Sequence, residues 1–433
     1  MRNILVLFFL LFQFYLEAQE KIIVSKADVL AAVQERNNTI KMSEQDVLMA
    51  KGDYEQTNAI VLPNISASHT AIATTNPLMA FGSKLNQGVL TQGDFNPVLL
   101  NNPSEVQDYA TRITVSQPLL NFDGLYQRKA AKAKLNATEL QANRVNDYLE
   151  LEVEKAYMQL QLSYKAVEVL EKAKITALEN KRIATNNFDQ GYLQKSDVLA
   201  VEVRVTEIEN QLHYAKSNIQ NASNGLSVLM NDDNYATLQP SDSLSIVSAD
   251  TETMFFSETR ADILAMESAT KAYSDMHKAD QMSFLPSLNA FGTYELHDDE
   301  LFKGATDGYL VGAALTWTLF EGGKRFGKFK KSKAEFEKSK LELDQYKAES
   351  QVELNRAKRM LQDAKNNLEL TTLALSQTQE SLRIRKNRFE QGLEKTTDLL
   401  AAETQFAQKQ LEYFTTIFNH NYALAYVQFL TKE

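Results

Sequence analysis

The sequence contains no cysteine and little glycine or proline: 0 Cys, 15 Gly and 7 Pro among 433 residues. Without cysteine there is no disulfide framework, no thiolate metal ligand, no cysteine nucleophile and no lipid-modified N-terminal cysteine. Gly and Pro fall well below their average use of about 7% and 5%, which argues against a turn-rich all-β protein and against low-complexity disorder. Asp+Glu (56) exceed Lys+Arg (46), and the net charge of −10 has the wrong sign for non-specific nucleic-acid binding. These properties favour a long, helical, acidic protein.

The usual sequence signatures of catalysis are also missing. The five histidines show no HExxH or HxxxH spacing, and there is no GxxxxGK[ST] phosphate loop, GxGxxG turn or GxSxG elbow. Neighbouring carboxylates such as Glu150, Glu152 and Glu154 lie beside Lys155, as is typical of a solvated helix face. The lack of Met-rich or His-rich tracts weighs against a metal cargo. We therefore expect a protein that is not an enzyme and that holds neither a metal nor a cofactor.

The N-terminus has the pattern of a secretory signal peptide. Arg2 precedes an apolar run from Ile4 to Leu16, which the polar-flanked Ala18 ends. This pattern predicts a signal peptide over 1–18 with cleavage after Ala18. The alternative, a membrane anchor, needs a longer apolar run than this one. No later segment has 18 consecutive apolar residues, so a mature chain that crosses a membrane would have to use strands.

The distribution of proline and glycine predicts very long helices. Proline is absent from 119–239 and from 287 to the end of the chain. Between Gly124 and Gly225 the only glycine is Gly191. Breaker-free segments rich in Ala, Glu, Lys, Gln and Leu are typical of helices. At 1.5 Å per residue, a helix over 125–188 would be about 96 Å long. Within it, a coiled-coil seam with alternating spacings of four and three is formed by Leu149, Val153, Ala156, Leu160, Ser163, Val167 and Leu170.

The chain also contains an internal two-fold repeat. The segment 187–191 (Asn-Phe-Asp-Gln-Gly) recurs at 388–392 (Arg-Phe-Glu-Gln-Gly), and each is followed six residues past its glycine by an Asp-Val/Leu-Leu-Ala segment. A Leu-Pro pair at 62–63 recurs at 285–286. Two copies of one unit therefore cover nearly the whole mature chain. Each copy is predicted to contain a helix, a strand, a loop, a strand, a long helix, a tight turn and a helix.

These patterns define the expected boundaries. The first repeat, 19–230, should contain helices over 25–58, 125–188 and 194–230, and strands over about 60–73 and 108–120. The second repeat, 257–430, should contain helices over 257–283, 324–389 and 395–430, and strands over about 285–297 and 308–320. An irregular linker, 231–256, should separate them and pack around the waist of the helical rods.

Alternation of apolar and small polar residues identifies the strands. It is clearest in 109–119 and 309–319. Strands of about ten residues with one apolar face and terminal aromatics fit a transmembrane barrel, although a hairpin of a soluble protein would show similar alternation. Four strands are too few to close a barrel, so several chains would have to contribute. The lipid-facing residues would be Tyr109, Ile113, Val115, Tyr309, Val311, Leu315 and Trp317.

The two loops between the strands of each repeat differ in length. The loop 74–107 is the least helical part of the chain and holds three of the seven prolines, whereas its counterpart, 297–308, is short. Long loops that join barrel strands normally lie outside the cell. We therefore expect 74–107 to be extracellular.

In their order, these motifs resemble the TolC-like outer-membrane efflux proteins. The resemblance rests on the signal peptide, the repeat, the Leu-Pro pairs, the F-x-x-G-x-x-x-x-x-D turns, the segment 260–263 (Arg-Ala-Asp-Ile) and the segment 117–124 (Gln-Pro-Leu-Leu-Asn-Phe-Asp-Gly). It covers about 25–430 and implies a mainly α protein with a membrane β-barrel part. Three chains would close one 12-stranded barrel, which a periplasmic tunnel of coiled-coil helices continues. The turns at Gly191 and Gly392 would be the periplasmic tips.

Two interpretations of the turn aspartates remain open. Gly191 and Gly392 suit a positive φ after a long helix, while Asp197 and Asp398 fall where a carboxylate caps the returning helix. Alternatively, the resemblance implies a pore gate made of carboxylates, an aromatic side chain and a base.

Transferred onto this sequence, the resemblance places Asp197, Asp398 and Phe389 in the gate. The basic position is occupied by the acid Glu394, so Lys195 with Glu394 is a candidate replacement ion pair. The resemblance also implies that a periplasmic adaptor docks at the tips, at Gly191, Tyr192, Leu193, Gly392 and Leu393.

We therefore expect a passive homotrimeric exit duct in the outer membrane of a Gram-negative bacterium. It would be in contact with outer-membrane lipid and gated at its periplasmic tip. It would serve a tripartite efflux or type I secretion system, in which an inner-membrane transporter supplies the energy. The alternative is a secreted or periplasmic coiled-coil scaffold or adhesin without a pore.

Overall fold

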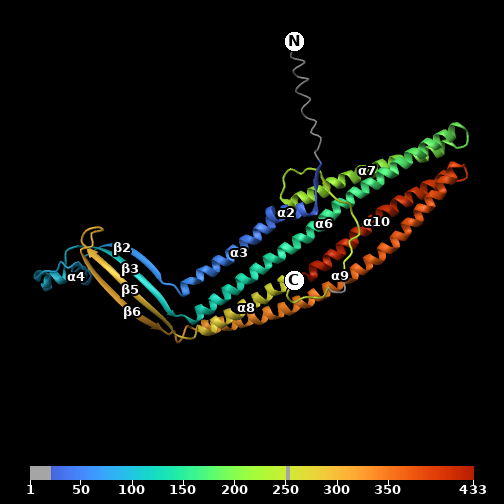
Figure 1. Cartoon of the computed structure of the whole chain (residues 1–433). Helices are drawn as coiled ribbons and strands as arrows, with labels where there is room; N and C mark the ends of the chain where they lie inside the picture. Colours follow the sequence, from blue (N-terminus) through green and yellow to red (C-terminus); the bar gives the residue numbers. More distant parts are fainter. Residues whose placement is uncertain (1–20, 250–253) are drawn as a thin grey trace, which may run out of the picture. The chain divides into compact units, whose positions relative to one another are not determined.

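The computed structural model describes residues 21–249 and 254–433 (Figure 1). The expected signal peptide, 1–18, lies outside the described residues. Among the helices of 21–249 and 254–433, none is both long and apolar enough to cross a membrane.

The first repeat contains a strand hairpin between helices. Its elements are β1 (Ile22–Val24), α2 (Lys26–Arg36), α3 (Asn38–Gln56), the 3-10 helix η2 (Thr57–Ile60), β2 (Asn64–Thr74), α4 (Pro77–Asn86), the 3-10 helix η3 (Gln92–Phe95), α5 (Pro97–Asn101), β3 (Val106–Leu120), α6 (Phe122–Asp189) and α7 (Lys195–Met230). Instead of one helix over 25–58, two helices meet at Asn37, whose backbone is extended (φ −62°, ψ 130°). The Asn37 side chain stabilises this break, because its amide donates to Leu229 O (2.7 Å) and its oxygen accepts from Thr39 N (2.7 Å).

The second repeat has the same order of long elements. It contains α8 (Ala261–Met282), β5 (Ser287–Asp298), β6 (Thr306–Thr316), α9 (Lys324–Glu390) and α10 (Thr396–Thr431), and is preceded by β4 (Leu238–Pro240). β4 pairs in parallel with β1, so the predicted linker contributes a strand that the sequence did not indicate. Trp317, expected within a strand, follows the last residue of β6, and its indole N–H donates to Phe284 O at 3.0 Å.

The compact units of the chain do not coincide with the two repeats. Of the described residues, one unit comprises 21–45, 140–249, 254–264 and 345–433, and the other comprises 46–139 and 265–344. Each unit therefore combines segments of both repeats. The first is helical apart from β1 and β4, and the second contains the four-stranded sheet.

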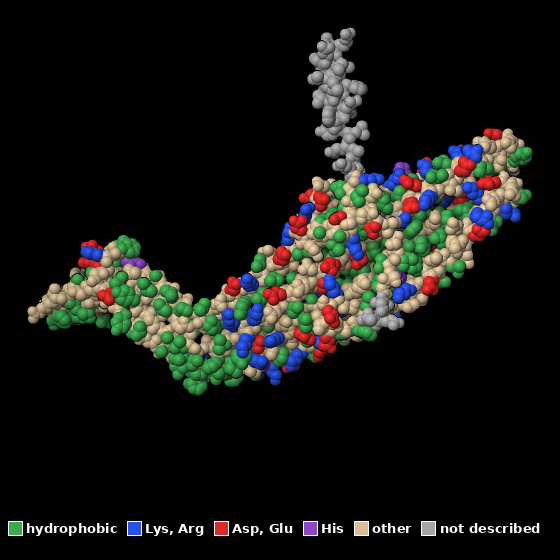
Figure 2. Space-filling model, in the orientation of Figure 1, with side chains coloured by type: hydrophobic (Ala, Val, Ile, Leu, Met, Phe, Trp, Pro, Cys, Tyr) green, Lys and Arg blue, Asp and Glu red, His purple; other side chains and the backbone are tan. Residues whose placement is uncertain are grey.

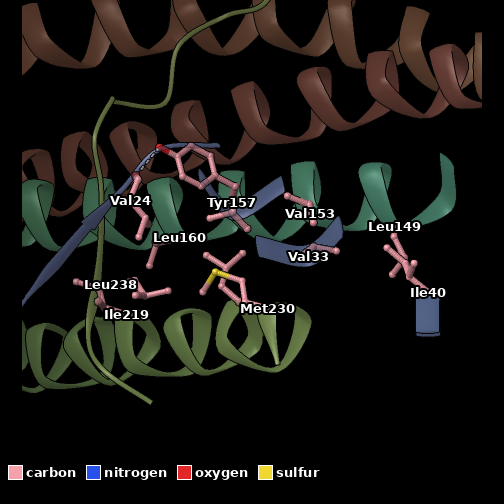
Figure 3. Close-up of a cluster of buried hydrophobic side chains, with 12 residues drawn as sticks. Val24, Val33, Ile40, Leu149, Val153, Tyr157, Leu160, Ile219, Met230 and Leu238 are labelled. Carbon is pink, nitrogen blue, oxygen red and sulfur yellow. Dashed lines mark hydrogen bonds between the residues drawn. The ribbon is translucent and has the colours of Figure 1, made fainter. Parts of the chain in front are cut away.

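The predicted coiled-coil seam of α6 is buried in the helical unit. Leu149, Val153 and Leu160 are at most 5% exposed and belong to one apolar cluster with residues of α2 and α7 (Figure 3). Tyr157 lies in the same cluster, and its hydroxyl donates to Val24 O (3.2 Å) and to Asp242 Oδ1 (2.5 Å). Removing such side chains from water is worth about 1.5–3 kcal/mol each. The seam therefore holds α6 to the N-terminal helix and to α7.

A buried ionic network lies at the start of α8 and explains the Arg-Ala-Asp-Ile motif. Arg260 is 2% exposed and donates to both carboxylate oxygens of Asp262 (3.0 and 2.6 Å) and to Leu430 O (3.1 Å). Tyr346 also donates to Asp262 (2.7 Å), and Arg144 Nε lies 3.5 Å from the same carboxylate. Burial by itself would raise the pKa of Asp262, but these donors and charges hold it below its usual value. One carboxylate thus connects α6, α8, α9 and the end of α10.

The sheet in the other unit is antiparallel in the order β2-β3-β5-β6. β2 and β6 are its edges, and β3 and β5 are its central strands (Figure 1). Cross-strand partners share a face of a sheet, so the register Ile113↔Tyr294↔Tyr309 and Val115↔Gly292↔Val311 defines an apolar face. Hydrophobic side chains cover much of the visible surface of this unit (Figure 2).

The opposite face of the sheet is polar. Its side chains include Arg112, whose guanidinium is 2.6 Å from the carboxylate of Glu295 on β5. Its neighbours Thr114 and Thr293 are paired in the register, and His297 follows on the same side of β5. The sheet thus separates an apolar face, which holds the strand residues expected to face lipid (all but Trp317), from a polar face.

Candidate functional site: the tips of the two long helical hairpins

The two hairpin tips have the same backbone conformation. Gly191 has φ +82° and Gly392 has φ +74°, a region that favours glycine. At the first tip, Tyr192 N donates to Asn187 O (2.8 Å). At the second, Leu393 N donates to Arg388 O (2.9 Å). These bonds to a residue five positions back satisfy carbonyls left free at the ends of α6 and α9. The sequence repeat is therefore a structural repeat down to individual hydrogen bonds.

At the first tip, Asp197 caps the returning helix. Its carboxylate accepts from Gln194 N at 3.1 Å, in the first turn of α7, where the helix dipole also favours a negative charge. Lys195 Nζ lies 5.6 Å from the centre of the Phe188 ring. Tyr192 is 79% exposed. The structure therefore supports the capping interpretation of Asp197 and leaves Tyr192 free for contact with another molecule.

At the second tip, Glu394 has two arginine partners. Its carboxylate lies 2.7 Å from Arg385 Nη1 and 2.8 Å from Arg388 Nε, and its side chain is only 10% exposed. Within one chain, these pairs replace the candidate pair with Lys195. The reason is the turn at Gly392, which returns the chain past the last two turns of α9, where Arg385 and Arg388 lie.

The two aromatic positions before the turns differ in burial. Phe389 is 2% exposed, whereas Phe188 at the equivalent place of the first hairpin is 37% exposed. In this chain Phe389 is thus a core residue of the tip. Asp398, in the first turn of α10, and Leu393 are both exposed. The structure therefore leaves Asp398 and Leu393, but not Phe389, available at the second tip.

A buried polar cluster beyond the tips was not predicted. Glu403 of α10 is 8% exposed and accepts a hydrogen bond from the amide of Asn180 on α6. Burial raises the pKa of Glu403 to about 7, against the opposing effects of Arg204, Lys386 and Asn180. The carboxylate borders a cavity of about 100 Å³ together with Arg204 of α7. The cluster joins residues 223 positions apart, so no local sequence pattern could have indicated it.

The ion pairs of Glu394 allow a test of the second tip. Glu394→Gln removes the charge that holds Arg385 and Arg388, and charge-assisted hydrogen bonds are worth about 1.5–3 kcal/mol. We expect amide exchange over 388–395 to become about tenfold faster, which equals about 1.4 kcal/mol of local stability. Hydrogen-exchange mass spectrometry measures this. The control is Glu390→Gln, at an exposed position nearby, which should leave amide exchange unchanged. If amide exchange were equally fast in the Glu394→Gln and Glu390→Gln variants, the ion pairs of Glu394 would not stabilise the tip.

Comparison with known proteins identifies the family. A two-fold repeat of strand hairpins and paired long helices defines a channel-forming class of outer-membrane protein. The family described as outer membrane efflux protein matches residues 29–232 and 257–416, which is most of the chain. The chain belongs to this family. No curated protein sequence matches it.

Solved structures with the same fold come from several bacteria. A membrane protein from Pseudomonas aeruginosa is 17% identical, with 94% of this chain and 93% of that chain covered and a TM-score of 0.82. VceC from Vibrio cholerae is 17% identical (93% and 95% covered, TM-score 0.79). The CmeC channel of Campylobacter jejuni is 16% identical (94% and 85% covered, TM-score 0.78). These similarities confirm the predicted fold class.

Family membership decides between the two predicted functions. The chain is an outer membrane efflux protein, in agreement with the efflux duct expected in the outer membrane of a Gram-negative bacterium. The alternative of a secreted scaffold or adhesin without a pore is therefore set aside.

Proposed function

We propose that three copies of this chain form one passive channel, closed as a 12-stranded barrel and gated at the helical tips. The observation that carries the proposal is the four-stranded sheet with two edge strands, one apolar face and one polar face. Edge strands expose unpaired backbone groups, which are not tolerated in lipid unless the sheet closes on itself. Three sheets joined β2 to β6 remove every edge and place the apolar face against lipid. In this arrangement Tyr109, Ile113, Val115, Tyr309, Val311, Leu315 and Trp317 face the membrane.

The proposed partners meet the chain at its tips. A periplasmic adaptor would contact the exposed apolar side chains Tyr192 and Leu393 (79% and 63% exposed). Leu193 and the backbone at Gly191 and Gly392 would complete the contact surface. An inner-membrane transporter would supply the energy, because the proposed channel is passive. The cargo would be small toxic compounds or exported polypeptides.

The oligomeric state and the pore are tested together. The purified protein should run as a trimer in unheated detergent gels, as a monomer after heating, and should form ion channels in planar lipid bilayers. A monomer recovered from the soluble periplasm, without channel activity, would contradict the proposal.

Asp398 tests the assignment of the gate. Because Asp398 is exposed at the tip, three copies would form a ring of carboxylates that binds multivalent cations at the periplasmic entrance. Asp398→Ala should abolish or strongly weaken block of single-channel conductance by such cations added on the periplasmic side. Asp197→Asn, at the residue that caps α7, is the comparison variant and should retain the block. Unchanged block in Asp398→Ala would remove this residue from the gate.

A further inference from the structure

The segment between β2 and β3 is a folded insertion with little charge. Residues 76–104, called the insertion below, contain α4, η3 and α5. Phe81 and Phe95 pack edge to face with ring centres 5.7 Å apart. The insertion has two charged residues, Lys84 and Asp94, and they pair at 2.7 Å. It is therefore a small ordered unit that carries no net charge.

Gln87 anchors the insertion to the end of the sheet. It is 4% exposed, and its amide nitrogen donates to Gln107 O (2.7 Å), Asp108 Oδ1 (3.0 Å) and Asp298 O (3.2 Å). The adjacent Asn86 O accepts from the Thr306 hydroxyl at 2.5 Å. A buried amide held by three acceptors from β3 and β5 sets the position of the insertion on these two central strands.

The anchor lies on the polar face of the sheet. Asp108 shares its side of β3 with Arg112, because side chains alternate along a strand. Thr306 is paired with His297, which is on the same face as Glu295. The two side chains of the sheet that hold the insertion, Asp108 and Thr306, therefore come from the polar face. On this face His297 Nδ1 also lies 3.2 Å from the Asp108 carboxylate. The shorter loop after β5 behaves differently, since its Phe302 stacks on His69 of β2, a residue of the apolar face.

The insertion also exposes an apolar surface. In the single chain, seven of its large apolar side chains are between 47% and 82% exposed, as follows: Leu78, Met79, Leu85, Val89, Phe95, Val98 and Leu99. In Figure 1, α4 lies beyond the end of the four strands. An ordered, uncharged segment with this many exposed apolar side chains is typical of a surface that another molecule covers.

We propose that the insertion is a lid over the outer mouth of the channel, and that its apolar surface is covered by the insertions of the two neighbouring copies. The inference rests on the proposed trimeric barrel, in which the polar face lines the lumen. Three insertions attached to that face then project over one opening and meet near its axis. Lipid is not the occupant, because the attachment is to the polar face. The internal Lys84–Asp94 pair leaves the three copies without mutual charge repulsion.

Such a lid gives the duct a second constriction, separate from the gate proposed at the tips. Cargo released from the barrel would pass only when the three insertions separate. Their contact is apolar, and the Gln87 anchors hold each lid to its own sheet, so separation need not unfold the insertion.

The absence of cysteine allows a direct test of the lid. Thr114→Cys places one thiol on the polar face of β3, opposite Thr293. Intact cells are treated from outside with a small maleimide and with a bulky polyethylene-glycol maleimide, and the labelling rates are compared. We expect the bulky reagent to be excluded from the lumen while the small one reacts. Replacing 75–105 with the chain's own short loop, 299–305, should abolish this difference.

A second variant tests the contact between copies without removing the lid. Val98→Asp introduces three like charges at a position that is 73% exposed in the single chain, so the insertion itself should still fold. We expect it to admit the bulky reagent, whereas the control Asn102→Asp, at an exposed polar position of the same insertion, should not.

The outcomes separate the lid from the channel. Labelling of Thr114→Cys by both reagents at similar rates, in a trimer that retains its insertion, would overturn the lid and leave the channel intact. Failure to form a heat-sensitive trimer, with no labelling by either reagent, would instead overturn the proposed barrel.

Discussion

Arg260→Ala should lower the free energy of unfolding by about 3–5 kcal/mol. The guanidinium is 2% exposed and supplies hydrogen bonds to Asp262, Leu430 O and Ser350. Without this side chain, the buried Asp262 carboxylate loses part of its compensating positive charge, and the Leu430 carbonyl loses its hydrogen-bond donor. Both losses lower the free energy of unfolding, because a buried polar group without a partner is costly. Urea unfolding followed by helical circular dichroism measures the change.

Two further variants test whether the loss of stability comes from the buried position of the network or would follow from removing any charged side chain. Arg383→Ala removes an arginine that pairs with Glu380 at 2.6 Å but is 62% exposed, so it should destabilise the fold far less than Arg260→Ala does. In the double variant Arg260→Met with Asp262→Leu, both charges are removed together, and the loss should be clearly smaller than the sum of the two single losses. A small effect of Arg260→Ala, similar to that of Arg383→Ala, would show that the network does not stabilise the fold.

Glu403→Gln should change how the stability of the helical unit depends on pH. The pKa of Glu403 is raised from 4.5 to about 7 in the fold, so the native state binds this proton more tightly than the unfolded chain. The stabilisation from proton binding is fully present below about pH 4.5 and is lost as the pH rises through 7, a difference of about 3 kcal/mol. Gln carries no charge to desolvate, so the variant should match the natural chain at pH 5 and exceed its stability at pH 8.

Thermal unfolding at pH 5 and pH 8 measures this effect. The control is Glu207→Gln, because Glu207 pairs with Arg204 (3.3 Å), which borders the same cavity as Glu403, but the Glu207 side chain is 55% exposed. It should leave the pH dependence as it is. Equal pH dependence in Glu403→Gln and in the natural chain would show that Glu403 does not titrate in this range.

The elements of this fold are encoded locally and could be predicted. The spacing of Leu149, Val153 and Leu160 places them on one helix face without reference to any partner, and they are buried. Gly191 and Gly392 are the residues that tolerate the positive φ of the two turns. Alternation predicted the two faces of the sheet in the same way, because a strand orients its side chains with a period of two.

Contacts between distant segments could not be predicted in this way. Glu394 was expected to pair with Lys195, but the turn at Gly392 brings it to Arg385 and Arg388. Phe389 resembled a gate residue and is buried, because the burial of one side chain depends on the packing of the neighbouring helices. Charge and residue type alone do not specify which of several available partners lies within reach.

The sequence alone was enough to predict two copies of a strand hairpin with long helices, two glycine turns and a sheet with two different faces. These features depend on hydrophobic periodicity, on the positions of Gly and Pro, and on the internal repeat, all of which can be seen in the linear order of the residues. Tertiary structure decided three other features: the contact of Asn180 with Glu403, the ionic network around Asp262 and the attachment of Gln87 to the polar face. Each of these joins segments that lie far apart in the sequence or belong to different elements. Their proximity depends on the register in which helices and strands pack, and that register is set by the whole fold.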